Sequence, residues 1–302
     1  MPNHSAGIII STRMSQKPVL QRTLLIVGAH PDDETFGCGG TLAHYARKGV
    51  KVFYACATRG EAGSSDPEHM EGFATMGDMR WSELQCAAKA IGMVAMHLGY
   101  RDSGMPGSED NKHPQALISA PVDEVAGRVV RAIRELKPQV IITSDPSGGY
   151  GHPDHIAMHN ATVRAFQAAG DPKQYPEAGP PFQPQKLYYP VFRNTLMKWV
   201  VRIMPLFGQD PRHQGRNKDI DMTVMARMQP PVHAVIRLSK QIETIRDKAT
   251  ACYASQLDNR PRRRTLISLV FRFSRQNADT FMRANPPVTS RRRERDLFAN
   301  IE

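Results

Sequence analysis

The chain has 302 residues, of which 40% are hydrophobic, so it can bury a substantial core as one large domain or as a domain with an appendage. It contains no apolar run of the roughly 18 residues that a membrane-spanning helix needs. Its first residues lack the charged and apolar regions of a signal peptide. We therefore expect an intracellular, cytoplasmic protein.

The net charge of +11 raises the question of a nucleic-acid partner. Much of the positive charge lies near the end of the chain, in residues 260–264 and 291–295. Neither cluster is interleaved with aromatic side chains, which a platform for stacking bases requires. The second cluster follows an Asn-Pro-Pro sequence and is typical of a mobile tail. We interpret residues 260–302 as a solvated basic extension, and nucleic acid is disfavoured as a partner.

The four cysteines are scattered along the chain and form no CxxC pair. In a chain of this length, that spacing argues against a disulfide framework and against a cysteine-rich zinc module. We expect Cys38, Cys56, Cys86 and Cys252 to be small apolar packing residues.

Short apolar runs alternate with helical patterns over the first two thirds of the chain. The sequence predicts strands at residues 24–29, 51–58, 94–98, 139–144 and 186–191. It predicts helices at about residues 39–48, 78–91 and 122–136, and a further helix that begins near His152. This alternation is typical of a Rossmann-like α/β fold, in which helices cover both faces of a mostly parallel sheet.

After about residue 200 the pattern weakens, prolines interrupt it, and only residues 239–255 read as firmly helical. We expect a smaller, irregular part there. The predicted organisation is a disordered segment over residues 1–22, one domain over 23–259, and the basic extension over 260–302. Within the domain, residues 23–191 form the core and residues 192–259 shape the pocket.

Two polar clusters follow predicted strands. The first is HPDDE at residues 30–34, and the second is SGGYGHPDH at residues 147–155. Ligand sites of open α/β sheets lie beyond the carboxyl ends of the strands, so we expect the two clusters to meet. Proline favours the first position of a helix, so Pro153 places His152 near the helix cap and His155 one turn further along.

Together the clusters offer the ligands of a divalent metal. Catalytic zinc typically takes three protein ligands, often two histidines and a carboxylate, and keeps one position for water. His30, Asp33 and His155 fit that set. Asp32 is then free to act as the general base that removes a proton from the water. His152 is left to stabilise the oxyanion or to protonate the departing amine.

Alternative interpretations exist for each cluster. One HPDD or HPDH string alone is more often a capped helix start or a solvated loop. His159, four residues after His155, is a competing ligand, but the glutamate of an HExxH helix is missing, so we expect His159 beside the site or on the surface. A magnesium-dependent phosphate-transfer site on the carboxylates is a further alternative, although magnesium prefers oxygen ligands and two histidines fit it badly.

The strings AHPDDETFGCGGTLAHYARKG, TRGEAG, RWSELQCAAKAIG, LGYRDSGM and DPSGGYGHPDH, between about residues 23 and 166, resemble the LmbE/PIG-L-type de-N-acetylase family. The resemblance is close to the branch that deacetylates the glucosaminyl-inositol precursor of mycothiol. It implies a metal-dependent N-deacetylase that acts on an N-acetylated amino sugar. It also implies zinc, or another divalent ion such as Fe²⁺, on His30, Asp33 and His155.

The resemblance implies further roles. Tyr150 would turn toward the substrate carbonyl, and Arg80 and Asp102 would bind the sugar. We assign Asp154 to orienting a histidine ring, with a charge that also favours the start of a helix.

The chain departs from the family pattern near its end, where Tyr253 stands in place of a common histidine before Ser-Gln. Residues 192–231 match little of the family. The substrate is therefore the least defined part of the prediction. A thiol-conjugate amidase of the same fold is the nearest alternative, followed by a basic protein that binds nucleic acid or an anionic surface. The sequence is also compatible with a homo-oligomer.

Overall fold

The computed structural model describes residues 21–191, 194–214, 221–227, 230–257, 277–290 and 292–301. Within these residues one sheet has the strand order β3-β2-β1-β4-β5-β7-β6. Strands β1 to β5 run parallel, and β7 pairs antiparallel with both β5 and β6. The sheet confirms the predicted α/β fold class. Its strands are β1 (Thr23–Gly28), β2 (Lys51–Cys56), β3 (Val94–His97), β4 (Val140–Thr143), β5 (Lys186–Pro190), β6 (Ala234–Arg237) and β7 (Ala278–Asn285).

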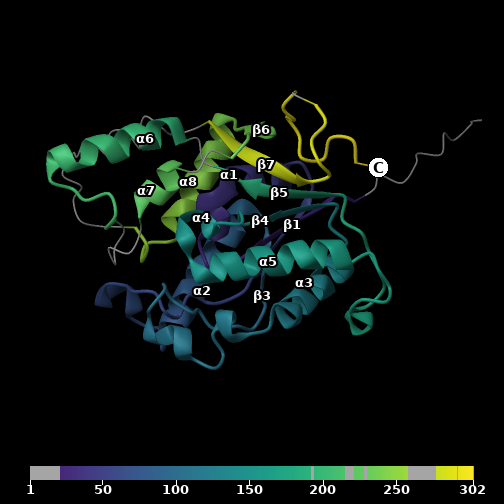
Figure 1. Cartoon of the computed structure of the whole chain (residues 1–302), viewed down its shortest axis with the longest axis horizontal. Helices are drawn as coiled ribbons and strands as arrows, with labels where there is room; N and C mark the ends of the chain where they lie inside the picture. The colour runs from purple at the N-terminus through teal and green to yellow at the C-terminus, as the bar shows by residue number, and fades with distance from the viewer. Residues whose placement is uncertain are drawn as a thin grey trace, which may run out of the picture.

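Helices cover both faces of the sheet (Figure 1). They are α1 (Asp33–Arg47), α2 (Met76–Ile91), α3 (Val122–Leu136), α4 (Gly148–Gly151), α5 (Pro153–Ala168), α6 (Asn194–Ile203), α7 (Met222–Arg227) and α8 (Lys240–Ala251). Short 3₁₀ helices lie at Pro67–Met70, Glu109–Lys112, Leu117–Ser119, Pro176–Ala178 and Met204–Phe207. Within the described ranges, no helix is long and apolar enough to cross a membrane.

The central strand β1 contributes side chains to two hydrophobic cores, one on each face of the sheet. Leu24 and Ile26 point into the core that α1, α2 and α8 cover. Leu25 and Val27 point into the opposite core, under α3 and α5, which lie side by side in Figure 1. Burial on both faces explains why this strand is apolar throughout rather than alternating.

Helix α1 begins at Asp33 but is kinked at Cys38, where φ is −159° and ψ is 29°. The part after the kink begins at Gly39, as the sequence predicts, and a further turn precedes it. The backbone N–H groups of Thr35 and Phe36 both donate to the carbonyl of Asp32, which closes the first turn. The earlier start places Asp33 in the first turn of the helix, directly beyond the end of β1.

The prediction of a mobile tail after residue 285 is wrong for the described residues. Strand β7 lies inside the sheet, between β5 and β6. Glu294 pairs with Lys186 over 2.8 Å and with Arg283 over 2.7 Å. Leu297 and Phe298 are buried in the core beside α1. Glu294 and the two buried apolar residues thus anchor this segment, whereas Arg292, Arg293 and Arg295 are exposed, as a solvated basic cluster should be. Residues 1–20 and the basic cluster at 260–264 lie outside the described residues.

The expectation for the cysteines holds for two of the four. Cys38 and Cys56 are buried, free packing residues. Cys86 on α2 and Cys252 at the end of α8 form a disulfide instead. The two helices pack together and bring these cysteines, 166 residues apart in sequence, into contact.

Candidate active site

A cleft of about 630 Å³ opens beyond the carboxyl ends of β1 and β4. Its walls come from the ends of these strands, the first turn of α1, α4 and the start of α5. The site residues that line it are His30, Asp32, Asp33, Arg80, Asp102, Tyr150, His152 and His155. The structure therefore brings the two polar clusters together. Of the described residues in 192–259, the predicted pocket-shaping part, only Gln256 lines this cleft.

The turn after β1 is fixed by its own side chains. The Asp33 carboxylate accepts hydrogen bonds from the backbone N–H groups of Ala29, over 3.0 Å, and His30, over 2.9 Å. The Tyr54 hydroxyl on β2 donates to the His30 carbonyl over 2.6 Å. A Cβ at Gly28 would lie 2.7 Å from that hydroxyl, so glycine is needed for this close approach.

The second cluster forms the bend from α4 into α5. Gly148, Gly149 and Gly151 all have positive φ, between 66° and 92°, a conformation that glycine adopts without steric cost. His152 caps α5, because its Nδ1 accepts a hydrogen bond from the Asp154 backbone N–H over 3.2 Å. His155 follows in the first turn of α5, as the sequence predicts.

Three of the predicted side chains point at one another. His155 Nε2 lies 3.2 Å from His30 Nδ1 and 3.2 Å from Asp33 Oδ1. The other Asp33 oxygen lies 4.0 Å from His30 Nδ1. Ligand atoms that all lie within 4.8 Å of one another belong to two groups at this site, His30 with His152 and His155, and His30 with Asp102 and Asp154; Asp33 is in neither group. Two imidazoles and a carboxylate in contact form a donor set that suits zinc and similar divalent ions.

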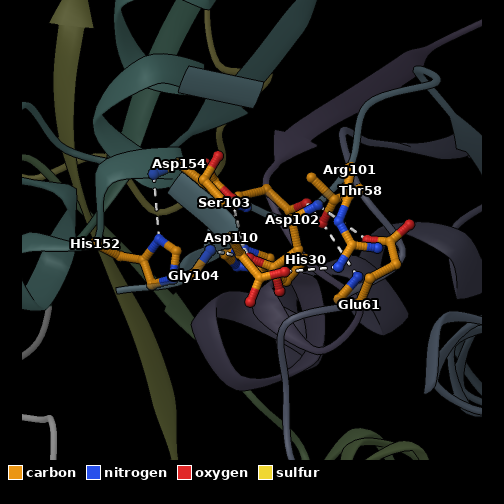
Figure 2. A network of polar contacts seen from close by, with 12 residues as sticks. His30, Thr58, Glu61, Arg101, Asp102, Ser103, Gly104, Asp110, His152 and Asp154 are labelled. Atoms are coloured by element: carbon orange, nitrogen blue, oxygen red, sulfur yellow. Dashed lines mark hydrogen bonds and ion pairs between the residues drawn. The ribbon is translucent and has the colours of Figure 1, made fainter. Parts of the chain in front are cut away.

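Two carboxylates lie against the other nitrogen of His30. Its Nε2 is 3.2 Å from Asp154 and 3.3 Å from Asp102, and the Ser103 backbone N–H donates to the same Asp154 oxygen. Figure 2 shows Asp154 between His152 and Ser103, with His30 beside Asp102. Such contacts set the orientation of a ligand ring and which of its nitrogens faces a metal.

The charges in this cluster stabilise one another. Burial alone would lower the pKa of His30, but Asp102, Asp154 and Asp33 outweigh it and raise this pKa well above its ordinary value. Burial likewise opposes ionisation of Asp33, but His155 and His30 hold the pKa of that carboxyl well below its usual range. Asp33 is therefore ionised, the form in which a carboxyl can bind a metal ion.

Asp32 differs from its neighbour in environment. Its backbone has φ 110° and ψ −28°, in the left-handed region that favours glycine. Its carboxylate accepts a hydrogen bond from the Arg80 guanidinium over 2.9 Å. Burial raises the pKa of Asp32 to about 6, against the opposing effect of Arg80. Adjacent carboxyls thus have pKa values on opposite sides of the ordinary value, a pattern typical of acid–base sites.

His152 and Tyr150 complete the wall of the cleft. The ring of His152 lies 4.5 Å from that of His30, centroid to centroid, and Tyr150 lies 5.5 Å from His155. Burial, with the nearby His30 and His155, lowers the pKa of His152 to about 2. The neutral ring uses Nδ1 as an acceptor, so its proton is on Nε2, which can act as a donor.

Arg80 and Asp102 both line the cleft, but each also contacts a residue of the reacting cluster, Asp32 and His30 respectively. Their predicted role in binding the sugar stays a prediction. His159 is buried beside the site, where its Nδ1 lies 2.9 Å from the Ser144 carbonyl oxygen. Tyr54 could not be identified from the sequence, because in the middle of an apolar strand it looks like an ordinary core residue.

Comparison with known proteins gives the site a family context. The profile of the PIG-L family, described as GlcNAc-PI de-N-acetylase, matches residues 25–166. A 1D-myo-inositol 2-acetamido-2-deoxy-alpha-D-glucopyranoside deacetylase of Rhodococcus erythropolis is 43% identical over 231 residues, which cover 72% of this chain and 78% of the relative. A deacetylase with the same name from Streptomyces scabiei is 45% identical over 176 residues, 55% of this chain.

The match spans about half the length of the Streptomyces relative, 54%. Among solved structures, N,N'-diacetylchitobiose deacetylase from Pyrococcus horikoshii matches with a TM-score of 0.56 and 17% identity, over 87% of this chain and 83% of that one. At that identity the likeness shows a shared fold only. The identity and coverage of the Rhodococcus relative confirm the family: the chain belongs to the PIG-L, or GlcNAc-PI de-N-acetylase, family.

Proposed function

We propose that this protein is a metal-dependent hydrolase that removes the N-acetyl group from a glucosamine–inositol conjugate. The observation that carries the proposal is the contact of His30, Asp33 and His155 in one cleft, with the Asp32 carboxyl beside them. The substrate class rests on the relatives, which are named for this deacetylation and reach 43–45% identity.

The donor set fits a divalent ion. His30 Nδ1, Asp33 and His155 Nε2 would hold it, while Asp154 and Asp102 fix the far side of the His30 ring. Zinc is the ion we propose, and Fe²⁺ accepts the same nitrogen and oxygen ligands. When bound, such an ion supplies Lewis acidity, which lowers the pKa of water toward neutrality and polarises a carbonyl.

Asp32 is the general base in this proposal. With a pKa of about 6 the carboxyl is mostly ionised near neutral pH, yet it remains basic enough to accept a proton from the attacking water. Arg80 holds the carboxylate through a hydrogen bond of 2.9 Å. Once protonated, Asp32 can return the proton to the departing amine, so the step consumes no net acid or base. Acetate and the free amino sugar leave the cleft.

His152 and Tyr150 face the charge that develops on the carbonyl oxygen. The neutral His152 ring has a proton on Nε2, so it donates a hydrogen bond to the oxyanion rather than a proton to the amine. Of the two roles that the sequence left open for His152, the neutral ring therefore favours stabilisation of the oxyanion. The Tyr150 hydroxyl is the second donor that we propose, and its ring lies in contact distance of both histidines.

An acetate-release screen tests the proposal. The purified protein, loaded with zinc, is given N-acetylglucosaminyl-inositol, N-acetylglucosamine and a thiol-conjugated derivative, and free acetate is measured. We expect the inositol conjugate to have the highest kcat/KM, and Asp32→Asn to release no acetate while keeping its zinc. Hydrolysis that is equal for Asp32→Asn and the wild type would disprove the role of the base. A preference for the thiol conjugate would favour the amidase alternative.

A further inference from the structure

Behind Asp32 lies a buried hydrogen-bond network that the mechanism above does not use. It joins the Asp32 backbone to Glu34 and Tyr253, two residues that do not reach the cleft. Both side chains are fully buried, with exposed fractions of 0%. Since a buried carboxylate is costly unless it is paired or hydrogen-bonded, its presence here calls for a physical explanation.

The first link in the network concerns the backbone of Asp32. A non-glycine residue with a φ of 110° is sterically unfavourable and persists only where its surroundings hold it. The Asp32 N–H donates to Glu34 Oε2 over 3.1 Å, and the Asp32 carbonyl accepts from Thr35 and Phe36. Hydrogen bonds therefore fix the peptide groups on both sides of the strained residue.

The second link concerns Glu34 itself. Its other oxygen, Oε1, accepts a hydrogen bond from the Tyr253 hydroxyl over 2.6 Å, and the Thr35 hydroxyl donates to the same oxygen. Bonds to both oxygens fix the rotation of the carboxylate. Tyr253 comes from a point 219 residues further along the chain, so this contact exists only in the folded protein.

The third link anchors Tyr253. On one side, Cys252 is bonded to Cys86 of α2. On the other, the Ser255 backbone N–H and hydroxyl both donate to Glu83 of α2, over 2.8 and 2.7 Å. Helix α2 also carries Arg80, which holds the Asp32 carboxylate. Helix α2 thus supports both parts of Asp32. Arg80 of α2 holds the Asp32 side chain, and Tyr253, which α2 anchors, holds the Asp32 backbone through Glu34.

We propose that Glu34 and Tyr253 are positioning residues, which hold the Asp32 backbone in its left-handed conformation and so aim its carboxylate at the reacting water. The inference rests on the proposed role of Asp32 as general base. The competing explanation is that the Tyr253–Glu34 bond only stabilises the core. The chain offers a matched control for that explanation, the bond from the buried Tyr188 hydroxyl to Glu294 over 2.5 Å, in another part of the core.

The first experiment compares Tyr253→Phe with Tyr188→Phe, both measured as zinc-loaded enzymes releasing acetate from N-acetylglucosaminyl-inositol. Loss of one bond to a buried carboxylate should lower kcat of Tyr253→Phe by about tenfold and leave KM within about twofold. Tyr188→Phe should keep both constants within about twofold, although the two variants lose similar thermal stability. Equal kcat values for the two variants would overturn the inference.

The second experiment asks whether Glu34 acts through an oxygen. Glu34→Gln keeps an oxygen that can accept the Asp32 N–H, whereas Glu34→Leu fills similar space without one. We expect Glu34→Gln to retain kcat within about tenfold and Glu34→Leu to lose about a hundredfold or more. Equal loss in both variants contradicts the inference, and if Glu34→Leu does not fold, the tyrosine pair decides alone.

A crystal structure of Tyr253→Phe provides a readout that does not depend on turnover. If the inference is right, Asp32 adopts more than one backbone conformation, or its φ leaves the positive region, while zinc content stays at the wild-type level. If Asp32 keeps a single φ near 110°, the inference is wrong whatever the kinetics. If the wild type releases no acetate, the proposed function fails instead, and the conformation of Asp32 still decides the structural claim.

Discussion

The Asp32 carboxylate and the Arg80 guanidinium form a buried ion pair over 2.9 Å, at the point where β1 turns into α1. Arg80 also donates to the Pro31 carbonyl over 2.7 Å, so it holds both the side chain and the preceding backbone. The pair balances two opposing effects on the Asp32 pKa. Burial raises this pKa, and the guanidinium lowers it, with a net value of about 6.

Removal of the Arg80 charge should therefore shift the pH profile of the enzyme. In Arg80→Met the carboxyl stays buried without its cation, so its pKa rises above 6. The base must be ionised to act, so activity falls as pH drops through this pKa. The acidic limb of kcat against pH should therefore move to higher pH, and kcat should recover partly in alkaline buffer.

Arg59→Met is the matched control for this prediction, because Arg59 pairs with Asp78 of the same helix at the protein surface. Its acidic limb should coincide with that of the wild type. If the limb of Arg80→Met also stays in place, Arg80 does not control the ionisation of the base.

Metal content should separate the proposed ligands from their neighbours. His155→Ala removes a nitrogen that lies 3.2 Å from both His30 and Asp33, so purified protein should contain far less than one metal ion per chain. His152→Ala should keep its metal, although His152 belongs to an overlapping group of potential ligands. Elemental analysis by mass spectrometry measures both, and metal loss from His152→Ala would place that ring among the ligands.

His152→Ala tests the oxyanion role as well. Loss of one preorganised donor from such a site typically costs about 10² to 10³ in kcat. Because the ring is neutral, with a pKa of about 2, it undergoes no titration near neutral pH. The variant should therefore lose rate equally across pH 6 to 9. A loss confined to low pH, where a titrating ring would carry the proton, would instead identify His152 as a proton donor.

Asp154 should affect the metal affinity of the site although we do not propose it as a ligand. Its carboxylate lies 3.2 Å from His30 Nε2 and accepts the Ser103 N–H, so Asp154→Asn leaves the shape but removes the charge that orients the ring. Loss of such a partner typically lowers metal affinity about 10- to 100-fold. Competition with a chelator measures the affinity. Unchanged affinity would show that Asp102, on the same nitrogen, is sufficient.

Local sequence patterns predicted the position of the site residues that directly follow a strand or begin a helix. His30 and Asp33 follow an apolar strand, and His155 follows a proline at a helix start, so sheet topology alone places them together. Contacts between distant segments were not predictable. Arg80 meets Asp32 across 48 residues, and Cys252 meets Cys86 across 166, and nothing in the local spacing of these residues encodes the pairing.

Strand β7 shows why the end of the chain was misread. Its sequence, ADTFMRAN, contains two charged residues and lacks the apolar run of a buried strand. The charges are satisfied by partners that the sequence does not reveal. Asp279 accepts hydrogen bonds from the Thr41 backbone N–H and hydroxyl, each over 2.7 Å, and Arg283 pairs with Glu294. A polar pattern excludes a core strand only when such partners are absent.

The packing of the final residues gives a direct stability test. Phe298 is 1% exposed and lies against the Tyr45 ring, with centroids 5.2 Å apart. The Tyr45 hydroxyl accepts from the Leu297 N–H and donates to Asp296, so this segment is tied to α1. Phe298→Ala should therefore lower the free energy of unfolding by about 3–5 kcal/mol.

Urea unfolding of Phe298→Ala, with Phe73→Ala as the control, measures this effect. Phe73 is 38% exposed in a loop, so its replacement should lower the free energy of unfolding by less than about 1 kcal/mol. The mobile-tail interpretation makes the opposite prediction, because a solvated residue contributes little when truncated. A loss below about 0.5 kcal/mol for Phe298→Ala would restore that interpretation and would remove the support that the end of the chain gives to β7 and α1.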